Sequence, residues 1–235
     1  MNRWLGFAGA ALTLMIGSSA WAGTTSTQIA DATPATEHGW TGPYLGIEGG
    51  YGWGQSHHSV PGFPSFDNKF AVPGALVGGT AGYNLQVAPF VFGAEADMSK
   101  SWQSGSTAGI PPVSCPPGGP TANCTTRLDW LGTLRLRAGY LVWHRFMPFV
   151  SGGFAAGEVH GSTDNGGNGG SATRFGWTAG TGVEAKIFAG WPAKIEYLHV
   201  DLGTAGTIFV RQPGAFPFNV SFSSDDVRAG LNYHF

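Results

Sequence analysis

Acidic and basic side chains are scarce in this sequence, and most of them fall in segments where apolar and polar residues alternate. Only 11% of the 235 residues are charged, against roughly 25% in an average soluble domain. In a β-strand, such alternation puts the charges on one face and the apolar side chains on the other. Twelve charged residues are predicted to share an enclosed interior in this way: Glu48, Glu95, Asp97, Arg127, Asp129, Arg135, Arg137, Glu184, Lys194, Glu196, Asp226 and Arg228.

Charges withdrawn from water must be paired or hydrogen-bonded. The mixed signs therefore predict a structural network of ion pairs, and a path for protons or ions is the alternative interpretation. Arg135 and Arg137 share one face and are expected to bridge Glu95 or Asp97 on a neighbouring strand.

Histidines offer a second kind of chemistry. His57 and His58 are adjacent in an expected outer loop, and His160 lies near another. Exposed histidines bind metal or haem, but no cysteine or carboxylate completes a ligand set here. Solvated loop side chains are the simpler interpretation, and no cofactor or metal is predicted.

A hydrolytic site is a third possibility. His160 and Ser162 are two residues apart, so a strand would place a base and a nucleophile on one face. An orienting acid is also needed, and only Asp164 is near in sequence. An enzyme is not predicted.

Cys115 and Cys124 are the only cysteines, in a stretch rich in proline and glycine. In an exported protein two cysteines so placed most simply form a disulfide that closes a loop. Zinc binding is disfavoured because no further cysteine or histidine stands at ligand spacing.

Eight alternating segments must position these residues. The expected strands are 42–54, 74–86, 90–102, 126–140, 148–160, 173–185, 192–202 and 221–235. Between them, short connections (near 87–89, 141–147 and 186–191) alternate with longer ones (near 55–73, 103–125, 161–172 and 203–220). An even strand number with this alternation of turns and loops is typical of bacterial outer-membrane barrels.

Alternation alone also suits a soluble β-sandwich, so the aromatic residues decide. Tryptophan, tyrosine and phenylalanine recur near the expected strand ends: Trp40, Tyr44, Trp102, Tyr140, Trp143, Trp177, Trp191, Tyr233 and Phe235. Amphipathic rings favour the boundary between bilayer and water. We therefore predict an all-β, eight-stranded, antiparallel up-and-down transmembrane barrel, with apolar faces toward lipid and charged faces inward.

The N-terminus predicts export. Residues 1–22 combine one early arginine, a short apolar stretch and small residues before an expected cut between Ala22 and Gly23, the pattern of a secretory signal peptide. Residues 23–39 are expected to be a flexible periplasmic segment and 40–235 the barrel. A net charge of −2 without any Lys/Arg cluster gives no sign of nucleic-acid binding.

Eight fragments, taken in order, resemble the small outer-membrane β-barrel family of alphaproteobacteria that includes opacity-like, haemin-binding and major surface proteins. They are Trp40–Gly46, Gly50–Gly54, Gly78–Asn84, Phe92–Asp97, Gly132–Tyr140, Pro148–Gly153, Lys194–Gly203 and Val227–Phe235. The resemblance implies a barrel in the outer membrane. It also implies that Tyr233 and the terminal Phe235 form the signal read by the outer-membrane insertion machinery.

Such proteins have structural, adhesive and ligand-binding roles, and are often grouped as a "porin family". Eight strands enclose an interior that side chains fill, whereas porin channels need about sixteen. We expect a non-enzymatic surface barrel that supports envelope integrity, contacts outer-membrane lipid and presents its loops for contact. The alternatives are a protein that binds haem or a host surface through its loops, a small-solute porin, and a barrel-embedded lipid hydrolase.

Overall fold

A computed structural model describes residues 39–60, 63–108, 123–143, 145–163, 168–188, 191–203, 207–208 and 218–235. The predicted signal peptide, its cleavage site and most of the predicted 23–39 segment lie outside these residues. Strands make up most of the described chain: β1 (Gly42–Val60), β2 (Phe63–Val87), β3 (Phe90–Ala108), β4 (Asn123–Tyr140), β5 (Phe146–Thr163), β6 (Asn168–Phe188), β7 (Trp191–Asp201), β8 (Thr207–Ile208) and β9 (Phe218–His234). No helix long and apolar enough to cross a membrane occurs in this part of the chain.

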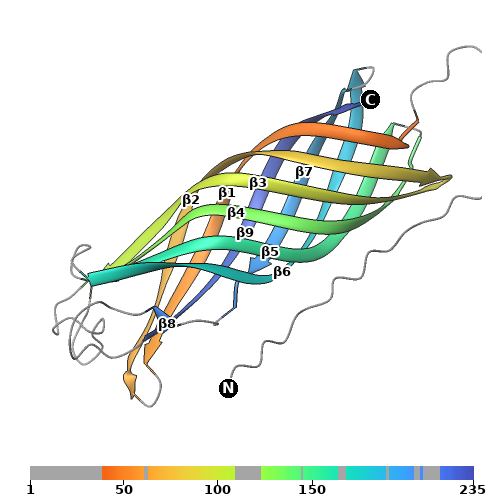
Figure 1. Cartoon of the computed structure of the whole chain (residues 1–235). Helices are drawn as coiled ribbons and strands as arrows, with labels where there is room; N and C mark the ends of the chain where they lie inside the picture. Colours follow the sequence, from red (N-terminus) through yellow and green to blue (C-terminus); the bar gives the residue numbers. More distant parts are fainter. Residues whose placement is uncertain are drawn as a thin grey trace, which may run out of the picture. The chain divides into compact units, whose positions relative to one another are not determined.

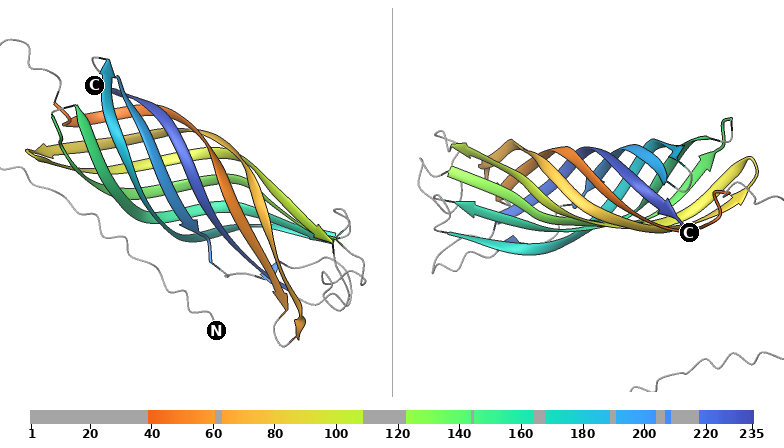
Figure 2. Two further views of the ribbon diagram at one scale, coloured as in Figure 1. Left: turned by 180° about the vertical axis from the view of Figure 1, so that it is seen from behind. Right: turned by 90° about the horizontal axis from the view of Figure 1, so that it is seen from above.

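The long strands close into a ring. Each pairs antiparallel with its neighbour in chain order from β1 to β7, then β7 pairs with β9, and β9 pairs with β1. Figures 1 and 2 show the strands winding obliquely around the barrel, with the short β8 beside one end of β9. A closed ring leaves no free sheet edge, which a lipid environment requires. The predicted eight-stranded antiparallel barrel is confirmed.

The connections differ between the two ends. Residues 88–89, 141–145 and 189–190 link strands at one end, which by the general rule for such barrels faces the periplasm. At the opposite end, here called the outer end, the first connection is shorter than expected. Residues 55–73 were expected to form a loop, but β1 and β2 continue through them and leave only residues 61–62 between the strands.

The outward face of the ring is apolar. Ile47 is 70% exposed and Leu136 is 73% exposed, whereas the neighbouring charge of Arg135 is 1% exposed. A soluble protein would reverse this arrangement, because water would take the charges and the core would take the leucines. The apolar wall is therefore a lipid-facing surface.

Exposed aromatic side chains border this wall at both ends. Tyr51, Trp53, Trp102, Phe175 and Trp177 lie toward the outer end, and Phe90, Tyr140, Trp143, Trp191, Tyr233 and Phe235 toward the short turns. Trp40 and Tyr44 depart from the expectation that they join this belt. Both are buried, at 2% and 1% exposure.

Strand β4 changes its facing once along its length. Leu128 and Leu131 are both buried, and the register of β4 against both neighbours shifts between them. This irregularity exchanges the two faces, so Arg127 and Asp129 point outward and pair with each other at 2.7 Å (Nε to Oδ1). Their assignment to the interior was wrong because it assumed unbroken alternation.

Candidate functional site

The barrel interior changes character from one end to the other. On β9 the inward side chains run from Val220 and Phe222 at the outer end, through Asp226 and Arg228, to His234 beside the short turns. Strand β7 shows the same order, because Lys194 and Glu196 lie toward the turns and Leu198 and Val200 toward the outer end. The interior therefore has a mainly apolar outer section and a charged middle section.

Ten of the twelve charged residues expected inside are brought together in the middle section: Glu48, Glu95, Asp97, Arg135, Arg137, Glu184, Lys194, Glu196, Asp226 and Arg228. We call this set the charge network. Its members come from β1, β3, β4, β6, β7 and β9, so it connects strands across the barrel as well as neighbours in the sheet.

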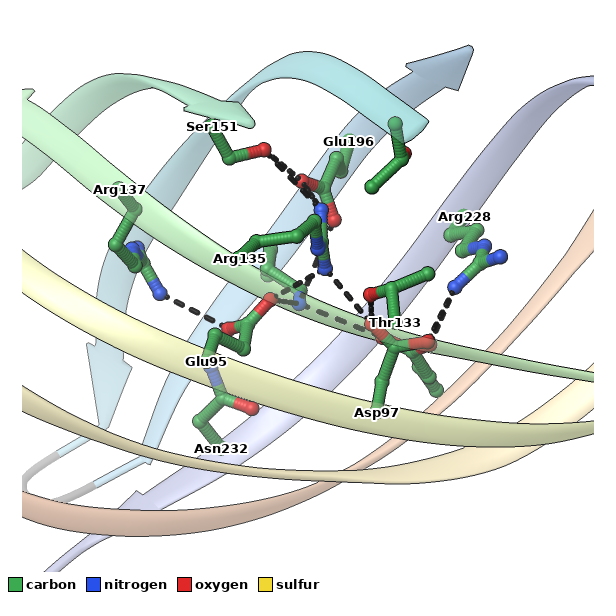
Figure 3. A network of polar contacts seen from close by, with 12 residues as sticks. Glu95, Asp97, Thr133, Arg135, Arg137, Ser151, Glu196, Arg228 and Asn232 are labelled. Carbon is green, nitrogen blue, oxygen red and sulfur yellow. Dashed lines mark hydrogen bonds and ion pairs between the residues drawn. The ribbon is translucent and has the colours of Figure 1, made fainter. Parts of the chain in front are cut away.

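Arg135 lies at its centre (Figure 3). One guanidinium nitrogen, Nη2, is 2.6 Å from Glu95 Oε1 and 3.1 Å from Asp97 Oδ2, and the other, Nη1, pairs with Glu196. The expected bridge from β4 to the β3 carboxylates is therefore present, and it extends across the interior to β7. Thr133 and Ser151 add hydrogen bonds to Asp97 and Glu196.

Glu95 receives two further cations. Lys194 Nζ lies 2.9 Å from its Oε1 and Arg137 Nη1 lies 3.1 Å from its Oε2. The hydroxyl of Tyr44 donates to Glu95 Oε2 at 2.7 Å, and Arg137 pairs in turn with Glu184. Each charge thus has several partners, which offsets the cost of removing it from water.

Arg228 forms the third centre. Its guanidinium contacts Glu48 at 3.0 Å, Asp97 at 2.9 Å and Asp226 at 3.0 Å. The charge network holds six carboxylates against four cations, so its formal charge is negative. His234 Nε2 stands 3.7 Å from Glu184 Oε1, beside the network.

Most buried side chains of the outer section are apolar, and Ser56, His58, Thr126 and Arg174 are buried beside them. We call the apolar set the apolar plug: Val72, Leu76, Leu128, Leu131, Ala155, Val159, Leu198, Val200, Leu202, Val220 and Phe222. All are at most 2% exposed. They come from β2, β4, β5, β7, the residue after β7, and β9, so the plug crosses the full width of the barrel.

The section beside the short turns mixes apolar and polar groups. Trp40, Val91 and Met147 form a small buried cluster, and the ring of His234 stacks on Tyr44 with 5.1 Å between centroids. Several buried polar atoms here have no hydrogen-bond partner, including Trp40 Nε1, both side-chain polar atoms of Asn84, and both ring nitrogens of His234. Buried atoms of this kind are commonly satisfied by internal water.

The predicted network named charged residues alone and so omitted their uncharged partners. Tyr44, Gln103, Thr133, Ser151 and Asn232 all hydrogen-bond to carboxylates of the charge network. Alternation indicates most of them, because each lies an even number of positions from a charged residue on the same strand. The pairs are Tyr44 with Glu48, Gln103 with Asp97, and Asn232 with Arg228.

The two adjacent histidines lie on strand β1, and successive strand residues face opposite sides. His57 is outward and partly exposed, whereas His58 is fully buried and its Nε2 lies 2.8 Å from Thr126 Oγ1. Burial, with the charges of His57 and Arg174 nearby, lowers the pKa of His58 to about 4. The expected pair of loop histidines was therefore wrong. In the described chain no three His, Cys, Asp or Glu side chains gather as a metal site.

The other candidate residues do not join the charge network. His160 and Ser162 share one face of β5, opposite Arg127 and Thr125; His160 is partly exposed and Ser162 is buried, and no hydrogen bond is found between them. Asp164 lies outside the described residues. Cys124 is the second residue of β4 and is buried, but Cys115 lies outside the described residues, so their disulfide stays a prediction.

A closed ring with an apolar outer wall, aromatic borders and charges inside defines a transmembrane β-barrel of the bacterial outer membrane. Residues 8–235 match the family described as outer membrane protein beta-barrel domain, and this chain belongs to that family. The resemblance noted in the sequence is thus confirmed.

Named relatives agree with this membership. The chain is 36% identical over 219 residues to the 31 kDa outer-membrane immunogenic protein of Brucella melitensis, covering 87% of each chain. It is 30% identical to the 25 kDa outer-membrane immunogenic protein of Brucella abortus, covering 86% of this chain and 82% of that one. It is also 30% identical to a 22 kDa outer membrane protein of Rhizobium leguminosarum, covering 69% and 64%. Among solved structures, OprG of Pseudomonas aeruginosa has a TM-score of 0.48 at 12% identity, covering 84% of this chain and 99% of that chain.

Proposed function

We propose that this protein is a non-conducting, non-enzymatic surface barrel that supports the integrity of the outer membrane and offers its outer end for contact. The observation that carries the proposal is the filling of the interior, in which the apolar plug follows directly on the charge network. A solute would have to displace both.

The charge network is better suited to hold strands than to conduct. Each Arg of the network contacts at least two other members, so moving one side chain would leave several buried charges unpaired, at a cost of about 3–5 kcal/mol. The side chains of the plug are apolar and cannot replace the water around a passing ion. The buried polar groups at the same level are themselves packed in place, as in the contact of His58 with Thr126. Internal water near the short turns would therefore not form a continuous path to the outer end.

In a membrane barrel the apolar faces lie against lipid, so the interior must hold the strands in register by other means. The ion pairs do this, because the arginines reach carboxylates at defined positions on other strands. Arg135 joins β4 to β3 and β7, and Arg228 joins β9 to β1 and β3. A rigid, non-permeable barrel is what such bonding supports.

The remaining alternatives have less support. A haem or metal site on both His57 and His58 would need two residues on opposite faces of β1. A lipid hydrolase would need a base that contacts its nucleophile, and His160 and Ser162 are not hydrogen-bonded. Contact with a host surface through the outer end stays a proposal without a named partner.

We also propose that Tyr233 and Phe235 form the assembly signal. They lie side by side on the outward face, with 5.0 Å between ring centroids, and Phe235 is 64% exposed. Insertion machinery could therefore reach both rings before lipid covers them.

Single-channel conductance of refolded protein in a planar bilayer tests the proposal. Negligible conductance is expected from the wild type, and a double variant that thins the plug, Leu128→Ala with Phe222→Ala, serves as the comparison with a weakened seal. Large, steady conductance of the wild type would contradict the proposal. In parallel, a deletion strain should become more permeable to large antibiotics, and an unaltered envelope would argue against the structural role.

A further inference from the structure

A polar pocket lies on the wall of the barrel toward its outer end, lined mostly by outward-facing residues together with the inward-facing Ser56 and Phe222. It has a volume of about 320 Å³ and is lined by Gln55, Ser56, His57, Lys69, Asp201, Gly203, Ser221, Phe222 and Ser223. Its outward-facing members stand on paired strands. His57 is opposite both Lys69 on β2 and Ser221 on β9, while Ser223 is opposite Gln55 on β1 and Asp201 on β7.

The position of the pocket relative to the bilayer follows from β1. Trp53, an exposed member of the outer aromatic border, shares its face with Gln55 and His57, which are two and four residues further toward the outer end. At about 3.3 Å per residue, these side chains lie about 7 and 13 Å beyond Trp53 along the strand. Since tryptophan marks the boundary of the hydrocarbon layer, the pocket faces the layer of lipid headgroups.

Two residues of opposite charge, Lys69 and Asp201, line the pocket. Lys69 is exposed and its side chain lines the pocket. Asp201 is held in place because its Oδ1 accepts a hydrogen bond of 2.7 Å from the backbone N–H of Gly203. The hydroxyls of Ser221 and Ser223 complete a set of short, neutral groups.

This set suits one kind of ligand. An exposed ammonium group attracts a phosphate, whereas a fixed carboxylate and neighbouring hydroxyls and amides bind the hydroxyl groups of a sugar. Acyl chains attached to such a headgroup would lie along the apolar wall that continues below the pocket, which carries Tyr51, Trp53 and Val227. A free phosphate would make no use of that wall.

We propose that this pocket binds the phosphorylated sugar headgroup of a glycolipid of the outer leaflet, with Lys69 pairing with a phosphate and Asp201 accepting from sugar hydroxyls. This inference goes beyond the proposed function, because it concerns the outer wall and is independent of whether the interior conducts.

Lipid binding can be measured by native mass spectrometry of the refolded full-length protein in neutral detergent, with lipid A bearing two phosphates as the probe. The wild type is expected to retain one lipid A, and Lys69→Gln to reduce the retained fraction at least fivefold. Lys69→Arg should restore it. The matched control is Lys100→Gln, which removes an exposed lysine of β3 that does not line the pocket and should change nothing. Heat-modifiable gel mobility confirms that each variant is folded.

The wild type alone provides a second comparison. Lipid A stripped of its phosphates should be retained at least fivefold less, and millimolar inorganic phosphate should not displace the intact lipid. Equal retention by wild type and Lys69→Gln, or equal retention of both lipids, would overturn the proposal. Displacement by inorganic phosphate would show that the pocket takes the free anion instead of a lipid.

Discussion

Arg228 Nη1 lies 3.0 Å from Glu48 Oε1, and this ion pair joins the last long strand of the barrel to the first. The two residues are 180 positions apart in the sequence, and both side chains are 1% exposed. In the complete barrel, pairing of β9 with β1 joins the two ends of the chain of strands. The ion pair therefore stabilises closure itself.

The central arginine should contribute far more to stability than a surface arginine on the same strand. Replacing Arg135 by Gln leaves Glu95, Asp97 and Glu196 with an uncompensated buried charge, and we expect a loss of about 3–5 kcal/mol. Arg127→Gln, which breaks the exposed pair with Asp129, should cost about 1 kcal/mol or less. Urea unfolding in lipid vesicles, followed by tryptophan fluorescence, measures both. Equal losses would mean that the network does not hold the strands.

Gly52 is required by a close approach inside the barrel. A Cβ at this position would lie 1.7 Å from Gln103 Nε2 and 2.3 Å from Asp226 Oδ1, so Gly52→Ala must displace both groups. The expected cost is about 1–3 kcal/mol, seen as a lower temperature of conversion in heat-modifiable gels. Gly49→Ala is the control, because the nearest atom to its Cβ would be 3.6 Å away. A Gly52→Ala barrel as stable as the Gly49→Ala barrel would refute the packing described.

An arginine introduced on the outward face should lower the free energy of unfolding by an amount that depends on its position along the barrel. Leu136→Arg places a charge on the apolar face of β4, where the side chain is 73% exposed, and should cost about 2–4 kcal/mol. Ser106→Arg makes the corresponding change four residues beyond Trp102 on β3, outside the aromatic border, and should cost at most about 1 kcal/mol. The measurement is unfolding free energy in vesicles. Similar values at both sites would place the membrane elsewhere on the barrel.

The lowered pKa of His58 predicts that the barrel loses stability in acid. Its pKa is lowered to about 4 by burial in the folded barrel, whereas an unfolded histidine titrates near 6.5. Between these values the unfolded chain binds more protons, so the free energy of unfolding should fall as the pH drops from about 6.5 to about 4, by a total of the order of 3 kcal/mol. Above pH 7 this group should have no effect.

Comparison of wild type with His58→Gln isolates this contribution. Unfolding measured between pH 4 and pH 8 should show a shallower decline in the variant, and the two proteins should run parallel above pH 7. Identical slopes across the whole range would show that His58 is not the group responsible.

Alternation of residue types predicted most of the architecture, because a membrane barrel imposes it on every strand. The inward facing of Glu95, Arg135 and Arg228 follows from the alternation of odd and even positions along each strand. Alternation could not predict the register shift between Leu128 and Leu131. This irregularity exchanges the two faces of β4, and no unusual residue type marks it in the sequence. Arg127 and Asp129 were misplaced for that reason.

The sequence pattern also did not predict how far β1 and β2 extend. Residues 55–73 carry glycine, proline and serine, which favour loops, yet pairing between β1 and β2 keeps them extended almost to residue 60. The pocket on the outer wall depends on that pairing, because it brings together Lys69, His57 and Ser221 from three strands. No local pattern in the sequence marks those three residues as neighbours.

The continuation of β1 and β2 past the aromatic border also governs how this protein tolerates inserted peptides. A single residue added within 55–60 would exchange the two faces of β1 beyond that point, turning His58 toward solvent and its neighbours inward. An insertion of two residues would restore the facing but shift every partner along the hairpin. Epitopes for surface display therefore belong between Val60 and Phe63, where added length alters neither the facing nor the register of the paired strands.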